Sequence, residues 1–146
     1  MKYLKLYENW KPLSNDDLDT IQKLQEIGVV SAQELVELKK LRQVEQRIIR
    51  YKGVGDLDLR NLRDSTLLKS LPDGLKVGGN LYLYDCTSLH SLPAGLIVDG
   101  DLDLTACTGL ESLPAGLVVG GDLYLYGCTG LKSLPQDLKV GGQIYR

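Results

Sequence analysis

Residues 119–139 read VGGDLYLYGCTGLKSLPQDLK, and the second part of the chain is built from copies of this stretch. Two copies of the same 21-residue length precede it at 77–97 and 98–118. A looser copy begins near Val54, and a last one is cut off after VGGQIYR. An internal period of this length is typical of stacked repeat units rather than of one globular core. We therefore expect residues 53–146 to form a solenoid of about four coils of 21–23 residues plus a final strand.

Each copy combines a strand-like segment with an irregular return segment. From Val119 to Leu125, small or apolar residues alternate with other residues, which is the period of a strand with one buried face. The return segment that follows ends near Pro135. One coil alone cannot bury its apolar residues, so the coils are expected to stack with their strands in a parallel sheet. The repeated Gly-Gly pairs are expected to form turns, because no Lys-Ser/Thr follows them as in a phosphate-binding loop.

Three copies share the pattern L-x-L-x-x-C-T-x-L-x-S-L-P-x-x-L in register. The matching residues are Leu81/Leu83/Cys86/Leu89/Leu92/Pro93, Leu102/Leu104/Cys107/Leu110/Leu113/Pro114 and Leu123/Leu125/Cys128/Leu131/Leu134/Pro135. This pattern resembles the leucine-rich repeat family, in particular the cysteine-containing repeats of plant immune receptors and the short LPX-type repeats of bacterial secreted effectors. The resemblance implies a parallel sheet that binds proteins, and a cysteine column whose side chains bond backbone groups of the turn.

One position departs from the pattern of that family. The leucine that the family has three residues before the first strand leucine is Gly78, Asp99 or Gly120 here, and a valine stands one place earlier. The resulting Val-x-Gly-x-Leu-x-Leu run also suits a flat-sided parallel β-helix, which is the alternative architecture. The first copy departs in another way, since its loop at 60–66 is about three residues longer and has Ser65 in place of the cysteine.

Residues 1–52 are expected to form a helical hairpin that caps the stack. An ordered segment of one helical turn or a short strand is expected up to Pro12. A helix is then expected from Ser14 to Gly28, and Ser31 with its following Glu34 predicts a capping box for a second helix. That helix should run to about Arg50 and bury one apolar stripe: Leu35, Leu38, Leu41, Val44 and Ile48.

The hairpin also resembles the short SHOCT-type module. In that module a helix, a Gly-Val-Val-Ser turn and a glutamate-rich second helix ending in Lys-Lys-Leu follow one another, and residues 24–31 and 34–41 match it. The resemblance implies oligomerisation or tethering. The alternative is that the apolar stripe covers the end of the solenoid, because terminal repeats need a cap with a polar outer face.

Charge and apolar composition exclude several classes of partner. Residues 53–146 hold seven Lys and Arg against eleven Asp and Glu, which disfavours binding to nucleic acid. The basic residues of the second helix are interrupted by glutamates and predict a solvated face. No apolar run reaches the roughly 18–20 residues of a membrane span, and no signal-peptide core is present. With three cysteines, an odd count, the sequence predicts a cytoplasmic protein without a disulfide framework.

No motif in the sequence predicts catalysis. The three cysteines are expected to form an inward column, and a metal site would need a fourth ligand beside them. His90 is the only histidine and is replaced by Glu111 and Lys132 in the other copies. LPX-type effectors that act as ubiquitin ligases keep their catalytic cysteine in a separate domain, so that activity is not carried over. We expect no enzyme, no cofactor and no metal.

The candidate site is the outward face of the strands. Its residues form three columns across the coils: Asp56, Asn80, Asp101, Asp122 and Gln143; Asp58, Tyr82, Asp103, Tyr124 and Tyr145; and Arg60, Tyr84, Thr105 and Tyr126. Tyrosines beside carboxylates combine stiff contact area with hydrogen bonding, which favours recognition of a basic or amide-rich partner. The candidate binding residues are Asp58, Tyr82, Tyr84, Asp101, Asp103, Asp122, Tyr124, Tyr126 and Tyr145. The alternative is that stacked aromatic side chains only stabilise the sheet.

These features favour a protein–protein interaction module that binds its partner through the Tyr/Asp face. The compact repeats and the start of the chain look like those of small phage or bacterial accessory proteins, which implies a host-interacting or defence-modulating adaptor. A second hypothesis is a self-assembling module, because the final strand at 140–145 leaves an open edge that predicts homo-oligomerisation. A third hypothesis is a small-ligand or carbohydrate binder that uses the tyrosines.

Overall fold

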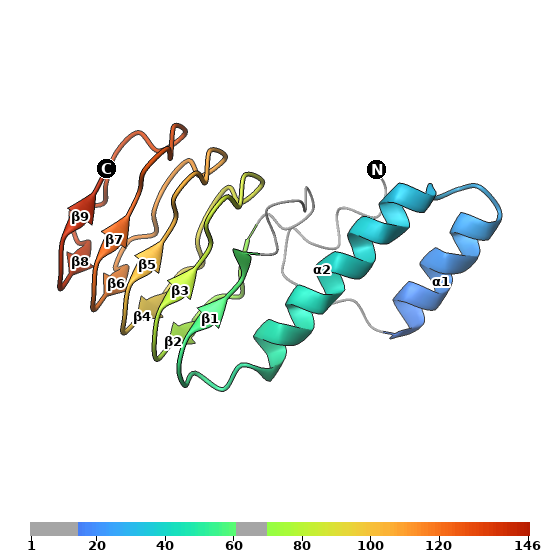
Figure 1. Ribbon diagram of the computed structural model, residues 1–146, viewed down its shortest axis with the longest axis horizontal. Helices are drawn as coiled ribbons and strands as arrows, with labels where there is room; N and C mark the ends of the chain where they lie inside the picture. Colours follow the sequence, from blue (N-terminus) through green and yellow to red (C-terminus); the bar gives the residue numbers. More distant parts are fainter. Residues whose placement is uncertain (1–14, 61–69) are drawn as a thin grey trace.

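The structure is a computed structural model that describes residues 15–60 and 70–146. The described residues form two helices followed by nine short strands, and the helices lie at one end of a stack of coils (Figure 1). The expectations for the segment up to Pro12, for Ser14 as the start of a helix and for the longer loop at 60–66 with Ser65 fall wholly or mostly outside the described residues.

The two helices are those that the sequence predicts. Helix α1 (Asn15–Glu26) ends just before Gly28, whose positive φ of 76° takes the chain out of the helical conformation. Helix α2 (Ala32–Arg50) begins with the predicted capping box. The backbone N–H of Glu34 donates to Ser31 Oγ at 3.2 Å, and Glu34 Oε2 accepts from the Ser31 N–H at 2.9 Å. The helix expected to extend to Gly28 is shorter, since Ile27 lies beyond the end of α1 and is 72% exposed.

The coils pair through two parallel sheets. The first, sheet 1, orders its strands β1-β3-β5-β7-β9 and comprises β1 (Leu57–Asp58), β3 (Leu81–Tyr82), β5 (Leu102–Asp103), β7 (Leu123–Tyr124) and β9 (Ile144–Tyr145). The second, sheet 2, orders its strands β2-β4-β6-β8 and comprises β2 (Lys76–Val77), β4 (Ile97–Val98), β6 (Val118–Val119) and β8 (Lys139–Val140). The predicted repeat solenoid with a parallel sheet is therefore confirmed, as a β-solenoid of about four turns. The two-sheet arrangement is also compatible with the parallel β-helix alternative.

Register along sheet 1 follows the sequence repeat. Leu81 pairs with Leu102 and Leu102 with Leu123, so equivalent residues of successive copies are direct neighbours. Leu57 pairs with Leu81, and these two residues are three positions further apart in the sequence than the other pairs, which agrees with the longer first copy. Because the register is constant, each type of side chain forms a column along the stack.

The alternating stretch from Val119 to Leu125 is not one strand, contrary to the expectation. Val119 belongs to sheet 2 and Leu123 to sheet 1, and the chain turns between them at the Gly-Gly pair. In Figure 1 these corners line the lower edge of the stack. Side chains still alternate between inside and outside around the corner, so a period of two arises without a continuous strand.

The interior of the stack is filled by leucines, valines and cysteines from every coil. The two strand leucines of the coils at 77–139 are buried, with exposed fractions of 0–2%. The predicted cysteine column is also present: Cys107 Sγ donates to the Leu83 carbonyl at 3.1 Å, and Cys128 Sγ donates to the Leu104 carbonyl at 3.0 Å. Burial raises the pKa of Cys128 to about 11, so its thiol is a protonated donor at neutral pH.

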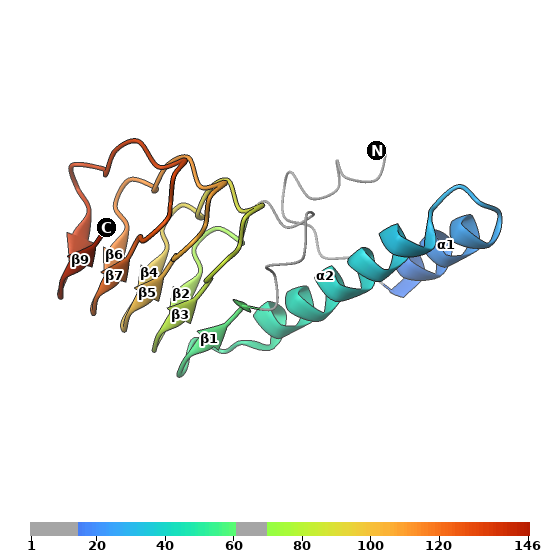
Figure 2. The same cartoon turned by 45° about the horizontal axis from the view of Figure 1, so that its top comes forward.

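Helix α2 contacts the first coil of the stack. Arg47 Nη1 donates to the Asp58 carbonyl at 2.7 Å. The Tyr51 hydroxyl donates to the Gly55 carbonyl at 2.6 Å and accepts from the Gly78 N–H at 3.1 Å. Val44 and Ile48 of α2 belong to the same buried cluster as the solenoid leucines. The C-terminal half of α2 therefore packs on the first coil, and Figure 2 shows the hairpin extending away from that end.

In the parts of the chain that the structure describes, neither helix combines the length and the apolar character that a membrane crossing requires.

Candidate binding surface on sheet 1

The first outward column is a hydrogen-bonded ladder along the stack. Asp56 Oδ1 accepts from the Asn80 N–H at 2.7 Å, and Asn80 Oδ1 accepts from the Asp101 N–H at 2.7 Å. Asp101 Oδ1 accepts from the Asp122 N–H at 2.8 Å, and Asp122 Oδ1 accepts from the Gln143 N–H at 2.7 Å. Each side-chain oxygen thus accepts a backbone N–H of the next coil, just before the residues at which the two strands pair. Two predicted binding residues, Asp101 and Asp122, hold coils together through this ladder.

Replacing Asp101 tests this role. We expect Asp101→Ala to lower the free energy of unfolding by about 1–3 kcal/mol, because the half-buried Asp122 N–H loses its acceptor. Asp101→Asn is the matched control and should cost less than about 0.5 kcal/mol, because Asn80 performs the same task one coil earlier. Denaturant unfolding followed by circular dichroism measures both. Equal stabilities of the alanine and asparagine variants would contradict the ladder.

The second column begins with an ion pair. Arg60 Nη2 lies 2.6 Å from Asp58 Oδ2, and Arg60 Nε donates to Asp58 Oδ1 at 2.9 Å. The same Oδ1 accepts the Arg60 backbone N–H at 3.0 Å. The hydrogen bonds from Arg60 lower the pKa of Asp58 below its usual range, and those to Asp58 raise the pKa of Arg60. The predicted binding residue Asp58 therefore already holds a cation.

Arg60 belongs to this face, and the candidate binding residues named from the sequence did not include it. Its guanidinium lies over the ring of Tyr82, with Cζ 5.2 Å from the ring centroid. The signal was in the sequence, because residues two apart on a strand share one face and Asp58 and Arg60 are of opposite charge.

Tyr82 and Tyr124 occupy the same column two coils apart and are held in the same way. The Tyr82 hydroxyl accepts from Asn80 Nδ2 at 2.9 Å. The Tyr124 hydroxyl donates to Asp122 Oδ2 at 3.3 Å. Burial and the neighbouring Asp122 carboxylate raise the pKa of Tyr124, so its hydroxyl remains a donor. Both rings therefore lean toward the ladder residue that lies two positions earlier in their own strand.

The far side of Tyr124 is covered by the next tyrosine. The rings of Tyr124 and Tyr145 are stacked with centroids 5.0 Å apart and planes at 9°. Tyr126 contacts Tyr145 as well, at 6.2 Å between centroids and an angle of 33°. The predicted aromatic ladder thus exists at the last two coils, where it contributes about 0.5–1.5 kcal/mol for each pair.

The third coil interrupts both tyrosine columns. Asp103 stands between Tyr82 and Tyr124, and Thr105 stands between Tyr84 and Tyr126. Asp103 Oδ1 accepts from the Thr105 N–H at 2.9 Å, and Asp103 is half-buried. Its Oδ2 accepts no hydrogen bond from the residues that the structure describes, although its charge contributes to the raised pKa of Arg60.

The two tyrosines of the third column are exposed. Tyr84 is 41% exposed and Tyr126 is 48% exposed. The outward face of sheet 2 differs, since its strand residues are Lys76, Ile97, Val118 and Lys139. The nine predicted binding residues all lie on the outward face of sheet 1, and this sheet carries the tyrosines and carboxylates together.

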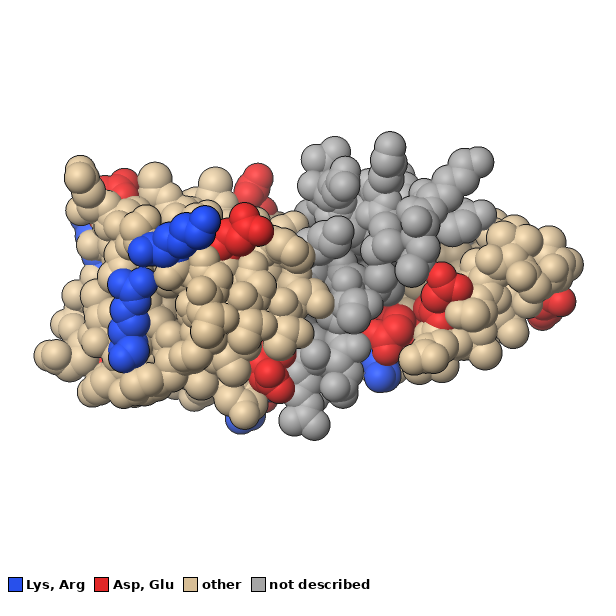
Figure 3. Space-filling view, turned by 90° about the horizontal axis from the view of Figure 1, so that it is seen from above, with Lys and Arg blue, Asp and Glu red and all other residues tan. Residues whose placement is uncertain are grey.

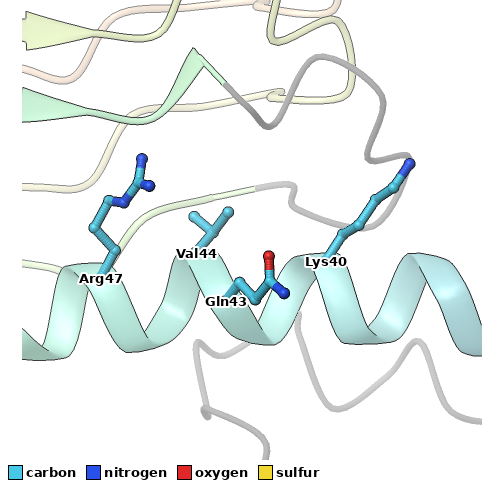
Figure 4. A pocket seen from close by; sticks show the side chains of 4 residues that line it. All are labelled: Lys40, Gln43, Val44 and Arg47. Carbon is cyan, nitrogen blue, oxygen red and sulfur yellow. The ribbon is translucent and has the colours of Figure 1, made fainter.

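Other surfaces offer weaker candidates. A pocket of about 180 Å³ is lined by Lys40, Gln43, Val44 and Arg47, which project from one side of α2 (Figure 4). Its cations are already engaged, because Arg47 bonds the Asp58 carbonyl and Lys40 lies 3.5 Å from Glu37. Seen from above, the described surface shows basic and acidic side chains of both signs and no large patch of a single sign (Figure 3). The described residues include no cluster of three or more potential metal ligands, and His90 is exposed with Nδ1 2.6 Å from the Ser88 carbonyl oxygen.

Comparison of the chain with protein-family models, with curated proteins and with solved structures finds no match. The class of protein is therefore defined by its own geometry. It is a short parallel β-solenoid with a helical hairpin on its first coil and a tyrosine-and-carboxylate face on sheet 1.

Proposed function

We propose that the protein is a non-catalytic binding module whose outward sheet 1 face docks a protein partner. The observation that carries the proposal is the row of four tyrosines on one rigid face: Tyr82 and Tyr124 beside the more exposed Tyr84 and Tyr126. Tyrosine presents a large amphipathic area with few rotatable bonds, so little conformational entropy is lost when it is covered.

Sheet stabilisation alone does not account for these tyrosines. Cross-strand stacking explains Tyr124 and Tyr145, whose rings are in direct contact. Tyr84, in contrast, is 41% exposed and is followed by Thr105 in the next coil. An exposed aromatic ring without an aromatic neighbour on the next strand adds little to sheet stability, which favours a use in recognition.

The charge of this face supports a basic partner segment. The solenoid residues 53–146 contain eleven acidic against seven basic residues, and the acidic residues Asp103 and Asp122 lie among the tyrosines. Complementary charge speeds association and disfavours nucleic acid as a partner. The resemblance of the repeats to the leucine-rich repeat family supports the same use of the sheet. A cytoplasmic phage or bacterial adaptor is the setting that we propose for it.

Affinity capture from an extract of the source organism, quantified by mass spectrometry, tests the proposal. The variant Tyr84→Ser with Tyr126→Ser should fold normally and lose the specific partner by at least about tenfold, which corresponds to about 1.4 kcal/mol. The control is Lys76→Ser with Lys139→Ser on sheet 2, which should keep the partner. Circular dichroism and thermal unfolding verify the fold of both variants. A captured set that is the same for both variants and the wild type would reject this face.

A further inference from the structure

Two strands on sheet 1 have the same sequence except for one residue. Residues 56–60 read DLDLR, and residues 101–105 read DLDLT. The second Asp of each, Asp58 or Asp103, occupies the same column of sheet 1. In the first stretch the chain itself pairs a cation, Arg60, with Asp58. In the second stretch Thr105 stands at the equivalent place, and Asp103 has no arginine two residues later.

The local geometry of the two carboxylates is also the same. Asp58 Oδ1 accepts the N–H of the residue two positions on at 3.0 Å, and Asp103 Oδ1 accepts the equivalent N–H at 2.9 Å. At Asp58 this bond leaves room for a bidentate guanidinium, which makes contacts of 2.6 and 2.9 Å with the two oxygens. Because the backbone bond is the same at Asp103, its carboxylate can accept a guanidinium in the same way.

Aromatic rings flank Asp103 on both sides. One side of the Tyr82 ring is covered by Arg60 of the first coil, and one side of the Tyr124 ring is covered by Tyr145 of the last. In the register of sheet 1, Asp103 pairs with Tyr82 on one side and with Tyr124 on the other. The two rings are two strand spacings apart, roughly 9.5 Å. A planar cation bound midway would lie about 5 Å from each ring, inside the roughly 6 Å limit of a cation–π interaction.

We propose that Asp103, Tyr82 and Tyr124 bind the side chain of an arginine from the protein partner. This inference rests on the proposed function and specifies the chemistry that the face recognises. The guanidinium pairs with both oxygens of the Asp103 carboxylate and lies between the two tyrosine rings, as Arg60 lies beside Asp58 and over Tyr82. Arginine fits better than lysine, because a planar guanidinium both matches a carboxylate bidentately and stacks on an aromatic face.

The experiment uses short peptides as probes of the full chain. Acetyl-Gly-Arg-Gly-amide is titrated into the isotope-labelled protein, and amide chemical shifts are followed by NMR. We expect saturable shifts centred on Asp103, with Kd in the millimolar range. The same peptide with citrulline, which has the shape of arginine without its charge, should bind at least about tenfold more weakly. The lysine peptide should fall between them.

Two variants test the site while retaining the rings of Tyr82 and Tyr124. Asp103→Asn keeps the acceptor for the Thr105 N–H but loses the charge, and it should abolish saturable binding of the arginine peptide. Thr105→Arg should abolish it as well, because the new side chain can pair with Asp103 as Arg60 pairs with Asp58. Lys139→Ser is the control and should bind the peptide as the wild type does, because this residue lies on sheet 2 and not on the proposed site. Thermal unfolding of each variant confirms that it is folded.

The outcomes separate this inference from the proposed function. Equal shifts with the arginine and citrulline peptides, or unchanged binding in Asp103→Asn or Thr105→Arg, would overturn the arginine site. If the Tyr84→Ser with Tyr126→Ser variant still loses its partner in that case, the binding face itself stands. If the arginine peptide binds as expected while the captured partners do not depend on Tyr84 and Tyr126, the proposed function fails and the arginine site stands.

Discussion

Gly121→Ala is expected to lower the free energy of unfolding by about 3 kcal/mol, although it adds a single methyl group. The added Cβ would overlap Oδ1 of Asp101 in the preceding coil and would lie 2.9 Å from the backbone carbonyl carbon of Gly100. The neighbouring backbone cannot move away without separating two coils. The displaced Asp101 side chain would also lose its bond from the Asp122 N–H, which adds to the steric cost.

The sign of the change in the free energy of unfolding distinguishes a crowded glycine from a glycine in open space. At a position with open space and ordinary backbone angles, Gly→Ala stabilises by about 0.4–1 kcal/mol, because alanine restricts the unfolded chain. A loss of stability at Gly121 therefore reports the close approach of the coils at the corner. Denaturant unfolding of the variant provides the value. A neutral or stabilising result would show that the coils are not stacked this closely.

A double variant shows which neighbour matters. In the Asp101→Ala background the nearest obstructing atom is absent, so adding Gly121→Ala should cost less than it does in the wild type. The coupling between the two substitutions should be at least about 1 kcal/mol, as for residues in direct contact. Strict additivity would place the steric conflict at the Gly100 backbone alone.

Leu117→Ala is expected to cost about 3 kcal/mol, within the range of about 2–5 kcal/mol for buried leucines. Leu117 is 0% exposed and lies between equivalent leucines of the neighbouring coils. Removing its side chain leaves a cavity that the constant register of the strands prevents from closing. Thermal and denaturant unfolding of the variant measure this loss.

Leu138→Ala is the matched substitution one coil further on. Leu138 has the same place in the repeat but is only half-buried, packing against the edge of the core. We expect a loss of about 1 kcal/mol, in proportion to its smaller buried area. The difference between the two variants measures what an additional stacked coil contributes. Equal losses would contradict the smaller burial of Leu138.

Much of the architecture is predictable because it depends on local rules or on strict repetition. The capping box at Ser31 and Glu34 is recognisable because both hydrogen bonds lie within four consecutive residues. The parallel pairing of β3, β5 and β7 is predictable because identical coils in register bring identical residues together. The inward cysteines follow for the same reason.

The corner at Gly120 and Gly121 shows where sequence reasoning was wrong. Alternation of apolar and other residues has a period of two in a strand, and it keeps that period when a chain turns a sharp corner between two short strands. Pattern alone therefore cannot separate one long strand from two short ones. The fact that two sheets are formed emerges only when the coils are stacked.

The candidate site also has one property that the sequence predicts and another that only the structure shows. The column to which each outward residue belongs follows from the 21-residue period, so the nine predicted residues lie in or beside the strands of sheet 1. The 21-residue period does not predict whether each of these side chains is free to bind a partner. Asp101 and Asp122 accept backbone N–H groups of the next coil, and Asp58 is paired with Arg60. Hydrogen bonds between coils join residues far apart in the chain, and no local pattern records them.

The 21-residue period, the identity of the inward and outward residues and the two helices are properties of the sequence, because each depends on neighbouring residues or on exact repetition. The tertiary structure alone distinguishes the carboxylates that hold coils together from Asp103, whose second oxygen accepts no hydrogen bond from the described residues. The physical reason is that hydrogen-bond satisfaction is decided by the coil above and the coil below. Asp101 meets a backbone donor from the next coil, whereas Asp103, two residues later on the same strand, is flanked by the rings of Tyr82 and Tyr124.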